Sequence, residues 1–221
     1  MTPQTQRRPL PGTQIDPLYP DSDGRPLGET DFHSSAMIWL REALQDHFAG
    51  RPDVYVASNL LLYYARGNPA GRRDPDVLVA KGVGKHRRRS FRVWEENVMP
   101  QVLFEISSPS TWQEDLEVKR PLYASLGVAE YFLFDPEGVC LDPRLQGFRL
   151  DQGAYAAMTP GADGSLESAE LGLRFTIEDA MLRLTDVRTG ALVPTRSERA
   201  DELAAEVARL QALLRGHNGQ E

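Results

Sequence analysis

The feature that most constrains the fold lies in the middle of the chain, where two apolar runs flank a segment with helical signals. The runs at 101–106 and 130–135 are rich in the aromatic and β-branched residues typical of strands. Residues 111–114, Thr-Trp-Gln-Glu, have the spacing of a helix capping box, and Gly127 supplies a helix stop. This order predicts a helix over 111–126 between two parallel strands, which is a βαβ unit.

Similar patterns predict further elements on both sides of this unit. A helix is expected to begin near Thr30 or Asp31, and Pro121 is expected to kink the helix over 111–126. The apolar face of the first helix consists of Met37, Ile38, Leu40, Leu44 and Phe48. Strands are expected at 53–58, 60–65, 75–80, 147–150, 154–158, 171–177 and 182–187. The predicted fold class is therefore α/β, with a mixed sheet flanked by helices.

We interpret the chain as one domain with an extension at each end. Residues 1–28 hold six of the sixteen prolines, which is typical of an irregular arm. The domain is expected to cover 29–190 and to include a β-rich extension from about 137. An amphipathic helix is expected over 195–216, with a stripe made of Leu203, Val207, Leu210 and Leu214. This helix either packs on its own domain or forms a homodimer contact, and the sequence leaves both open.

Composition limits the classes of protein to which this chain can belong. With 41% apolar and 26% charged residues, it has the balance of a soluble globular protein. The apolar runs are far shorter than the roughly 18 residues that a membrane-spanning helix needs, and we recognise no signal-peptide pattern. We therefore expect a cytoplasmic protein with no membrane partner. Cys140 is the only cysteine, which excludes an intramolecular disulfide. The net charge of −7 counts against a protein that coats nucleic acid by charge alone.

Three charged residues stand at positions where a charge needs an explanation. Glu105 lies within an apolar strand, where an ionised carboxylate is costly unless it faces solvent, is paired or binds a metal. Asp76 begins a predicted strand, where it is either a turn residue or a ligand. Lys119 shares a helical face with Leu116 and Tyr123, so it either reaches out to solvent or is held as a functional cation.

Together these three residues indicate metal-assisted chemistry. Two carboxylates at neighbouring strand ends can bind a divalent ion, and Mg²⁺ takes only one or two carboxylates while it keeps several waters. An ammonium beside them can orient one of those waters, and the metal can stabilise the charge that develops on a phosphate. The combination suits hydrolysis of a phosphodiester.

The order of these elements resembles the PD-(D/E)XK nuclease superfamily, and more closely the Uma2 (DUF820) group of predicted bacterial endonucleases. The matching residues are Pro-Asp-Val at 75–77, Glu-Ile-Ser-Ser-Pro-Ser-Thr at 105–111, Asp115, Lys119, Tyr123, and Gly-Val-Ala-Glu-Tyr-Phe-Leu-Phe-Asp-Pro at 127–136. The resemblance spans roughly 30–190, and 105–136 is its specific part. It implies a restriction-endonuclease-like core, dependence on Mg²⁺ or Mn²⁺, and cleavage of nucleic acid, with DNA as the favoured substrate.

The resemblance also implies the roles of individual residues. Asp76 and Glu105 would bind the metal together with the backbone carbonyl of Ile106. The third motif position, which is usually a lysine in the superfamily, is Ser107 here. In the Uma2 group that lysine is moved to the following helix, so Lys119 would position the attacking water.

Besides Ser107, two more residues are expected close to this centre. Asp115 precedes Lys119 by four residues and can pair with it on the helix. His33 opens the first helix, where the family often has a histidine, although a lone histidine at a helix start is commonly just exposed. The other three histidines have no zinc-ligand spacing with it, so we do not expect a zinc site.

A basic stretch at 81–92 holds six Lys or Arg residues and no acid. It can contact the phosphate backbone of nucleic acid, or it can be a solvated loop whose charges balance Glu95 and Glu96. The candidate phosphate contacts are Lys85, Arg87, Arg88 and Arg89.

The sequence thus predicts a Mg²⁺-dependent endonuclease of the Uma2 type and leaves two alternatives open. One is a catalytically inactive module with the nuclease fold that binds nucleic acid. The other is an oligomeric scaffold in which the C-terminal helix is the working element.

Overall fold

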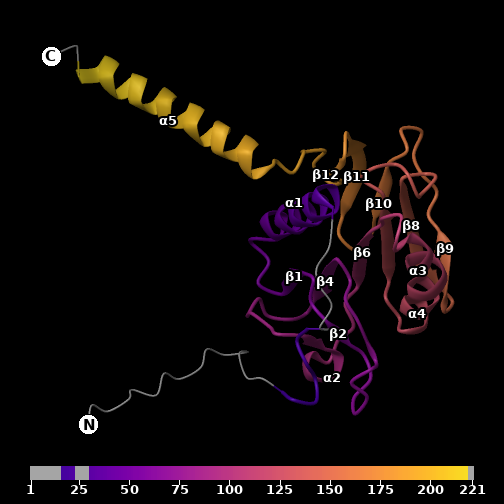
Figure 1. The fold of residues 1–221 in the computed structure, drawn as a ribbon. Helices are drawn as coiled ribbons and strands as arrows, with labels where there is room; N and C mark the ends of the chain where they lie inside the picture. Colours follow the sequence, from indigo (N-terminus) through magenta and orange to yellow (C-terminus); the bar gives the residue numbers. More distant parts are fainter. Residues whose placement is uncertain (1–15, 23–29, 219–221) are drawn as a thin grey trace, which may run out of the picture.

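The computed structural model describes residues 16–22 and 30–218 of the chain. Its centre is a six-stranded mixed sheet, in which only β6 and β7 run parallel to each other (Figure 1). In spatial order the strands are β1 (Val54–Ser58), β4 (Val77–Lys81), β6 (Val102–Ile106), β7 (Glu130–Phe134), β8 (Leu145–Asp151) and β9 (Ala154–Ala157). Most of the irregular arm expected over 1–28 lies outside the described residues, and 16–22 contain no helix or strand.

The predicted βαβ unit is confirmed, but its helix differs from the expectation. It consists of α3 (Trp112–Glu114), a π-helical turn (Asp115–Lys119) and α4 (Arg120–Ser125). In the wider turn the N–H of Arg120 donates to the carbonyl of Asp115, one residue further back than in an α-helix. We attribute this turn to Pro121, which lacks the N–H that an α-helix needs there.

The capping box expected at Thr111 does not form. The structure shows no hydrogen bond from the Thr111 side chain to the first turn of α3. Instead, the Thr111 hydroxyl accepts a hydrogen bond from the N–H of Ser108 at 3.1 Å, and so organises the loop before the helix. Sequence spacing alone did not show that the preceding loop competes for the same hydroxyl.

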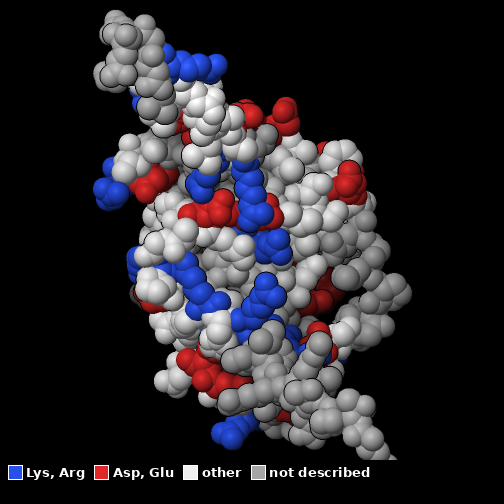
Figure 2. Space-filling model, turned by 90° about the vertical axis from the view of Figure 1, so that its left-hand side faces the viewer, with Lys and Arg blue, Asp and Glu red and all other residues white. Residues whose placement is uncertain are grey.

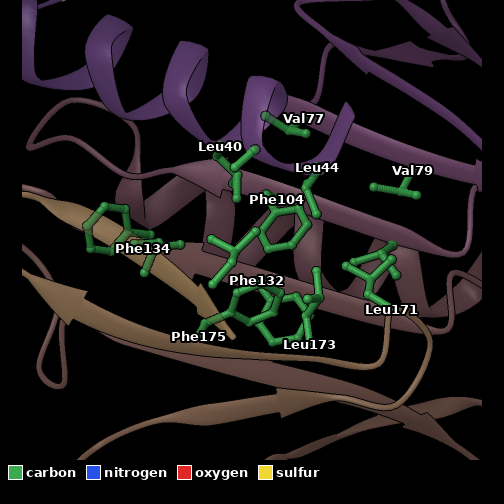
Figure 3. Packing of buried hydrophobic residues seen from close by; sticks show 14 of the residues in the cluster. Leu40, Leu44, Val77, Val79, Phe104, Phe132, Phe134, Leu171, Leu173 and Phe175 are labelled. Carbon is green, nitrogen blue, oxygen red and sulfur yellow. The ribbon is translucent and has the colours of Figure 1, made fainter. Parts of the chain in front are cut away.

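One face of the sheet packs against α1 (Asp31–His47), and of the two residues expected near its start, Thr30 is the one that caps it. The core below it is aromatic (Figure 3), with Phe104 of β6 and Phe132 of β7 stacked at 5.0 Å between ring centroids. Phe175 meets both rings edge to face, at 5.5 and 5.1 Å. The prediction that Ile38 belongs to the buried face of α1 is wrong, because its side chain is 44% exposed.

Two small sheets complete the domain. The first is formed by β10 (Leu166–Ser168), β11 (Leu173–Glu178) and β12 (Met181–Asp186), and it packs under α1. The second is formed by β3 (Arg72–Arg73), β2 (Leu62–Tyr63) and β5 (Phe91–Arg92), and is followed by the short helix α2 (Val93–Glu96). The four strands expected after 137 correspond to β8, β9, β11 and β12.

The strand expected over 60–65 is wrong in extent, since only Leu62 and Tyr63 pair there. The cause is visible at Asn59, which has a φ of 47° in the left-handed region. The chain therefore turns out of the central sheet directly after β1, and β2 pairs in the second small sheet. This turn matters for the site, because it places the β2–β3 hairpin beside Asp76.

The C-terminal helix expected over 195–216 is α5 (Arg196–Asn218), and it begins with a reciprocal capping box. The Glu198 N–H donates to the Thr195 hydroxyl at 2.9 Å, and the Thr195 N–H donates to the Glu198 carboxylate at 2.7 Å. Beyond its first turns the helix projects away from the domain (Figure 1). Leu203, Val207 and Leu210 are 62%, 52% and 46% exposed, so these positions do not pack on the domain. No described helix combines the length and apolarity needed to cross a membrane.

Candidate active site

Glu105 points into the protein interior rather than to solvent. Its side chain is 2% exposed and lies on the face of β6 that packs against α4. The hydroxyl of Tyr123 donates a hydrogen bond to Oε1 at 3.0 Å, and the Nζ atom of Lys119 lies 2.9 Å from Oε2. Of the possibilities that the sequence left open for this carboxylate, exposure on a half-buried strand is therefore excluded.

Lys119 connects two buried carboxylates. Its Nζ atom is 2.9 Å from Oε2 of Glu105 and 2.9 Å from Oδ1 of Asp115, and its side chain is only 12% exposed. The hydroxyl of Ser107 donates to Oδ2 of Asp115 at 3.1 Å, which fixes that carboxylate against the end of β6. Asp115 and Lys119 are the first and last residues of the π-helical turn, so this turn sets their positions; such turns are frequent at functional sites.

Asp76 joins this cluster from the start of β4. Its Oδ2 atom accepts a hydrogen bond from the N–H of Ile106 at 2.6 Å and lies 3.2 Å from Nε2 of His33. The side chain of Asp76 is thus held by the end of β6 and by the first turn of α1. His33 is mostly buried, so the structure brings it to the site instead of leaving it at an exposed helix start.

The site gathers three carboxyl groups, those of Asp76, Glu105 and Asp115, around the ammonium of Lys119. Burial raises the pKa of Glu105 well above its ordinary value, and repulsion from Asp76 and Asp115 adds to this rise. Burial also raises the pKa of Asp115. Burial by itself would lower the pKa of Lys119, but attraction to Glu105 and Asp115 outweighs it and the pKa is raised. Lys119 therefore stays an ammonium at neutral pH.

Comparison with known proteins decides the family. Residues 17–184 match the sequence family Uma2, which is described as "Putative restriction endonuclease". This chain belongs to the Uma2 family. A structural match is the crystal structure of "a putative nuclease belonging to DUF820 from Anabaena variabilis ATCC 29413". The TM-score is 0.50 at 13% identity, covering 75% of this chain and 79% of that chain, which supports the fold. No curated protein matches this chain.

The residues present fit the divalent metal that the Uma2 assignment implies. Among the residues that the structure describes, no group of three His, Cys, Asp or Glu side chains has the arrangement of a metal cage. Mg²⁺ does not require one, because it is held by one or two carboxylates plus waters. Asp76 and Glu105 are hard oxygen donors, and a cation would offset the burial and the repulsion from Asp76 and Asp115 that raise the pKa of Glu105. Ile106, whose backbone carbonyl is the third expected ligand, also donates its N–H to Oδ2 of Asp76.

Three residues of the basic stretch, Lys85, Arg87 and Arg88, lie beside α1 and the edge strand β1. Figure 2 shows that Lys and Arg side chains gather on the face at this edge, with acidic side chains between them. A groove of about 490 Å³ there is lined by Arg41, Lys85, Arg87 and Arg88, among others. The side chain of Lys85 donates to the carbonyl of Phe48, and Arg87 is exposed.

Other residues of this stretch are engaged in internal ion pairs. Arg88 makes two hydrogen bonds to Glu96, at 2.6 and 2.7 Å, and its guanidinium lies over the ring of Tyr55. Arg89 pairs with Asp21, and Arg92 bonds to Glu95 at 3.0 Å. The charge balance with Glu95 and Glu96 that the sequence suggested is therefore present, while phosphate contact by this stretch stays a prediction.

Sequence reasoning missed two features of the Uma2 site. It placed Tyr123 on the helical face of Lys119 and among the residues that match the Uma2 group, but it did not indicate that the Tyr123 hydroxyl bonds to Glu105. The spacing of four residues from Lys119 would have indicated that both side chains reach the same carboxylate. It also attached no role to Arg72 and Arg73, which line a cavity with Lys119. Their position just before Asp74-Pro75-Asp76 was the available signal.

Proposed function

We propose that this Uma2 protein is an endonuclease that uses Mg²⁺ or Mn²⁺ to hydrolyse phosphodiester bonds of nucleic acid, with DNA as the favoured substrate. The observation that carries the proposal is the convergence of Asp76, Glu105 and Lys119 at one end of the sheet. The family description of a restriction endonuclease supports the reaction class. The metal, the substrate and the residue roles are our inference.

In the proposed reaction, a water oxygen bonds to phosphorus while one ester P–O bond breaks. The water gives up a proton to solvent, and the departing oxygen takes one up. A bound divalent ion would lower the pKa of the water and offset charge on the phosphate. Asp76 and Glu105 would hold that ion, with the carbonyl of Ile106.

The remaining residues would orient these groups. Lys119 would donate a hydrogen bond to the attacking water and stabilise negative charge, but because its pKa is raised it would not act as the base. Asp115 and Ser107 would hold Lys119 in place, since they form the chain of contacts from Lys119 to the end of β6. His33 would orient Asp76.

The proposal predicts that Asp76→Asn abolishes metal-dependent cleavage. Cleavage of plasmid and of single-stranded DNA by the wild-type protein should require Mg²⁺ or Mn²⁺. The variant should be slower by at least about 100-fold, because even outer-shell partners of a metal ligand are worth about 10–100-fold. Asp53→Asn is the matched control, since Asp53 is a partly exposed carboxylate paired with Arg51 on the surface. Equal rates for the wild type and Asp76→Asn on all substrates would contradict the proposal.

We also propose that α5 pairs with a second copy of the chain. The exposed stripe of Leu203, Val207 and Leu210 has spacings of four and three residues, as in a coiled coil. The wild-type protein should have the mass of a dimer in light scattering, and a chain that ends at Pro194 should be a monomer. A chain carrying Leu203→Lys and Leu210→Lys should also be a monomer. A wild-type monomer at micromolar concentration would contradict this prediction.

A further inference from the structure

A cavity of about 650 Å³ adjoins the site at Lys119. The β2–β3 hairpin and the loop that leads to Asp76 form one side, and the start of the α3 segment forms the other. Its polar lining consists of Arg72, Arg73, Asp74, Thr111, Glu114 and Lys119. The volume lies within the range of about 300–1,000 Å³ that is usual for small-molecule sites, so the space can admit a nucleotide unit.

The two arginines of this cavity differ in their partners from Arg88 and Arg183, which are also half-buried. Arg88 and Arg183 are paired with carboxylates. In the described part of the chain neither Arg72 nor Arg73 has an acidic partner: Arg72 donates to the carbonyl of Pro69 at 3.1 Å, and Arg73 donates to that of Arg72 at 2.8 Å. The Nε atom of Arg73 is buried without a hydrogen-bond partner. A partly buried guanidinium of this kind is costly unless an anion completes its contacts.

The charges of the site show why an anionic substrate needs these arginines. The ammonium of Lys119 is already shared between Glu105 and Asp115. Asp74 and Glu114 add negative charge to the cavity lining. A phosphodiester that approached this cluster would be repelled unless further cations faced it. In the described lining of the cavity the cationic residues besides Lys119 are Arg72 and Arg73, and the planar donor geometry of a guanidinium group matches phosphate oxygens.

We propose that Arg72 and Arg73 bind a backbone phosphate of the nucleic acid that neighbours the scissile phosphodiester, with the attached nucleotide in this cavity. The inference rests on the proposed function, whose reaction places the scissile bond beside Asp76 and Lys119. Arg73 is the principal contact, because the guanidinium of Arg72 also lies over the ring of Tyr63 at 5.9 Å. Arg72 supports it from the same strand. Both are positioning residues for the substrate.

The test measures binding separately from cleavage. Anisotropy of a fluorescein-labelled 12-nucleotide DNA, single-stranded and duplex, is titrated with full-length protein in EDTA over a series of salt concentrations. Arg73→Gln should weaken binding about tenfold and lower the slope of log Kd against log salt by about 0.7–0.9, the value for one lost phosphate contact. Arg73→Lys should retain the slope but lose part of the affinity. Arg188→Gln, which removes an exposed arginine from the β12 turn, is the matched control.

The outcomes separate this inference from the proposed function. For DNA cleavage in Mn²⁺, Arg73→Gln should raise KM with little change in kcat. If Arg73→Gln cleaved DNA with the KM and the salt slope of the wild type, the inference would be overturned and the proposed function would stand. Binding about tenfold weaker in Arg73→Gln, alongside a wild-type protein that never cleaves, would overturn the function and leave only the phosphate contact of Arg73 standing. The inference would be overturned if the wild-type protein bound no oligonucleotide. It would also be overturned if millimolar inorganic phosphate displaced the DNA only from variants that lack Arg73. Variants are compared only where their melting temperatures match the wild type.

Discussion

Replacing Lys119 by methionine is expected to lower the free energy of unfolding of the metal-free protein by about 3–5 kcal/mol, the usual loss when one partner of a buried ion pair is removed. The methionine keeps most of the aliphatic volume but leaves Glu105 and Asp115 without their shared cation. The measurement is urea unfolding in EDTA, followed by far-UV circular dichroism. The expected loss of stability therefore measures the ion pairs of Lys119 with Glu105 and Asp115, which the proposed reaction also uses.

The loss should depend on pH and on metal in a defined direction. Burial raises the pKa of Glu105 and of Asp115, so the folded variant holds protons more tightly than the unfolded chain does. Its stability then falls as pH rises through the interval above the ordinary carboxyl pKa values. The deficit relative to the wild type should be smaller at pH 5 than at pH 8, and Mg²⁺ should reduce it at pH 8.

Lys81→Met is the control for this prediction. Lys81 pairs with Glu170, but both side chains are about one-third exposed, so that pair should be worth about 1 kcal/mol or less. Glu105→Gln in the Lys119→Met background should recover part of the loss, because it removes one of the two uncompensated charges. If Lys119→Met unfolds at the same urea concentration as Lys81→Met at pH 8, the ion pairs do not contribute as the geometry indicates.

The parts of the fold that the sequence predicted are those fixed by local chemistry. The two strands and the helix of the βαβ unit follow from apolar runs and Gly127, and the start of α1 follows from Thr30. The pairing of Asp115 with Lys119 was also predictable, because residues four apart share a helical face. Glu105 was identifiable because a carboxylate in an apolar strand requires a partner.

The parts that the sequence did not predict depend on contacts between distant segments. The Thr111 hydroxyl had two possible partners, and only the folded loop selects Ser108. The hydrogen bond from Ile106 to Asp76 spans thirty residues, and no spacing rule indicates it. The β2–β3 hairpin leaves the central sheet at Asn59, which is why the cavity beside Lys119 was not foreseen. The sequence therefore predicted which residues form the site, but it did not predict which residues line the cavity beside it.

Replacing Phe175 by alanine is expected to destabilise the whole domain by about 3–5 kcal/mol, because a fully buried ring is removed and a cavity is left. Phe175 belongs to β11, yet its ring packs against Phe104 and Phe132 of the central sheet (Figure 3). The core cluster that contains it runs from α1 to the segment after β12. The second small sheet is not part of this cluster, so the change should not disturb it directly.

Unfolding followed by two probes distinguishes one cooperative unit from two. Trp39 of α1 donates to the carbonyl of Leu182 in β12 at 2.6 Å, so the tryptophan fluorescence is expected to respond to the contact between these elements. In Phe175→Ala the fluorescence transition and the far-UV circular dichroism transition should shift together to lower urea. Phe32→Ala is the matched control, since that ring is 53% exposed and should change stability by less than about 0.5 kcal/mol. Two separated transitions in Phe175→Ala would mean that β10–β12 unfold independently. Glu105 lies on β6, the strand that also carries Phe104, so coincident transitions would show that the β-rich extension stabilises the strand that presents the site.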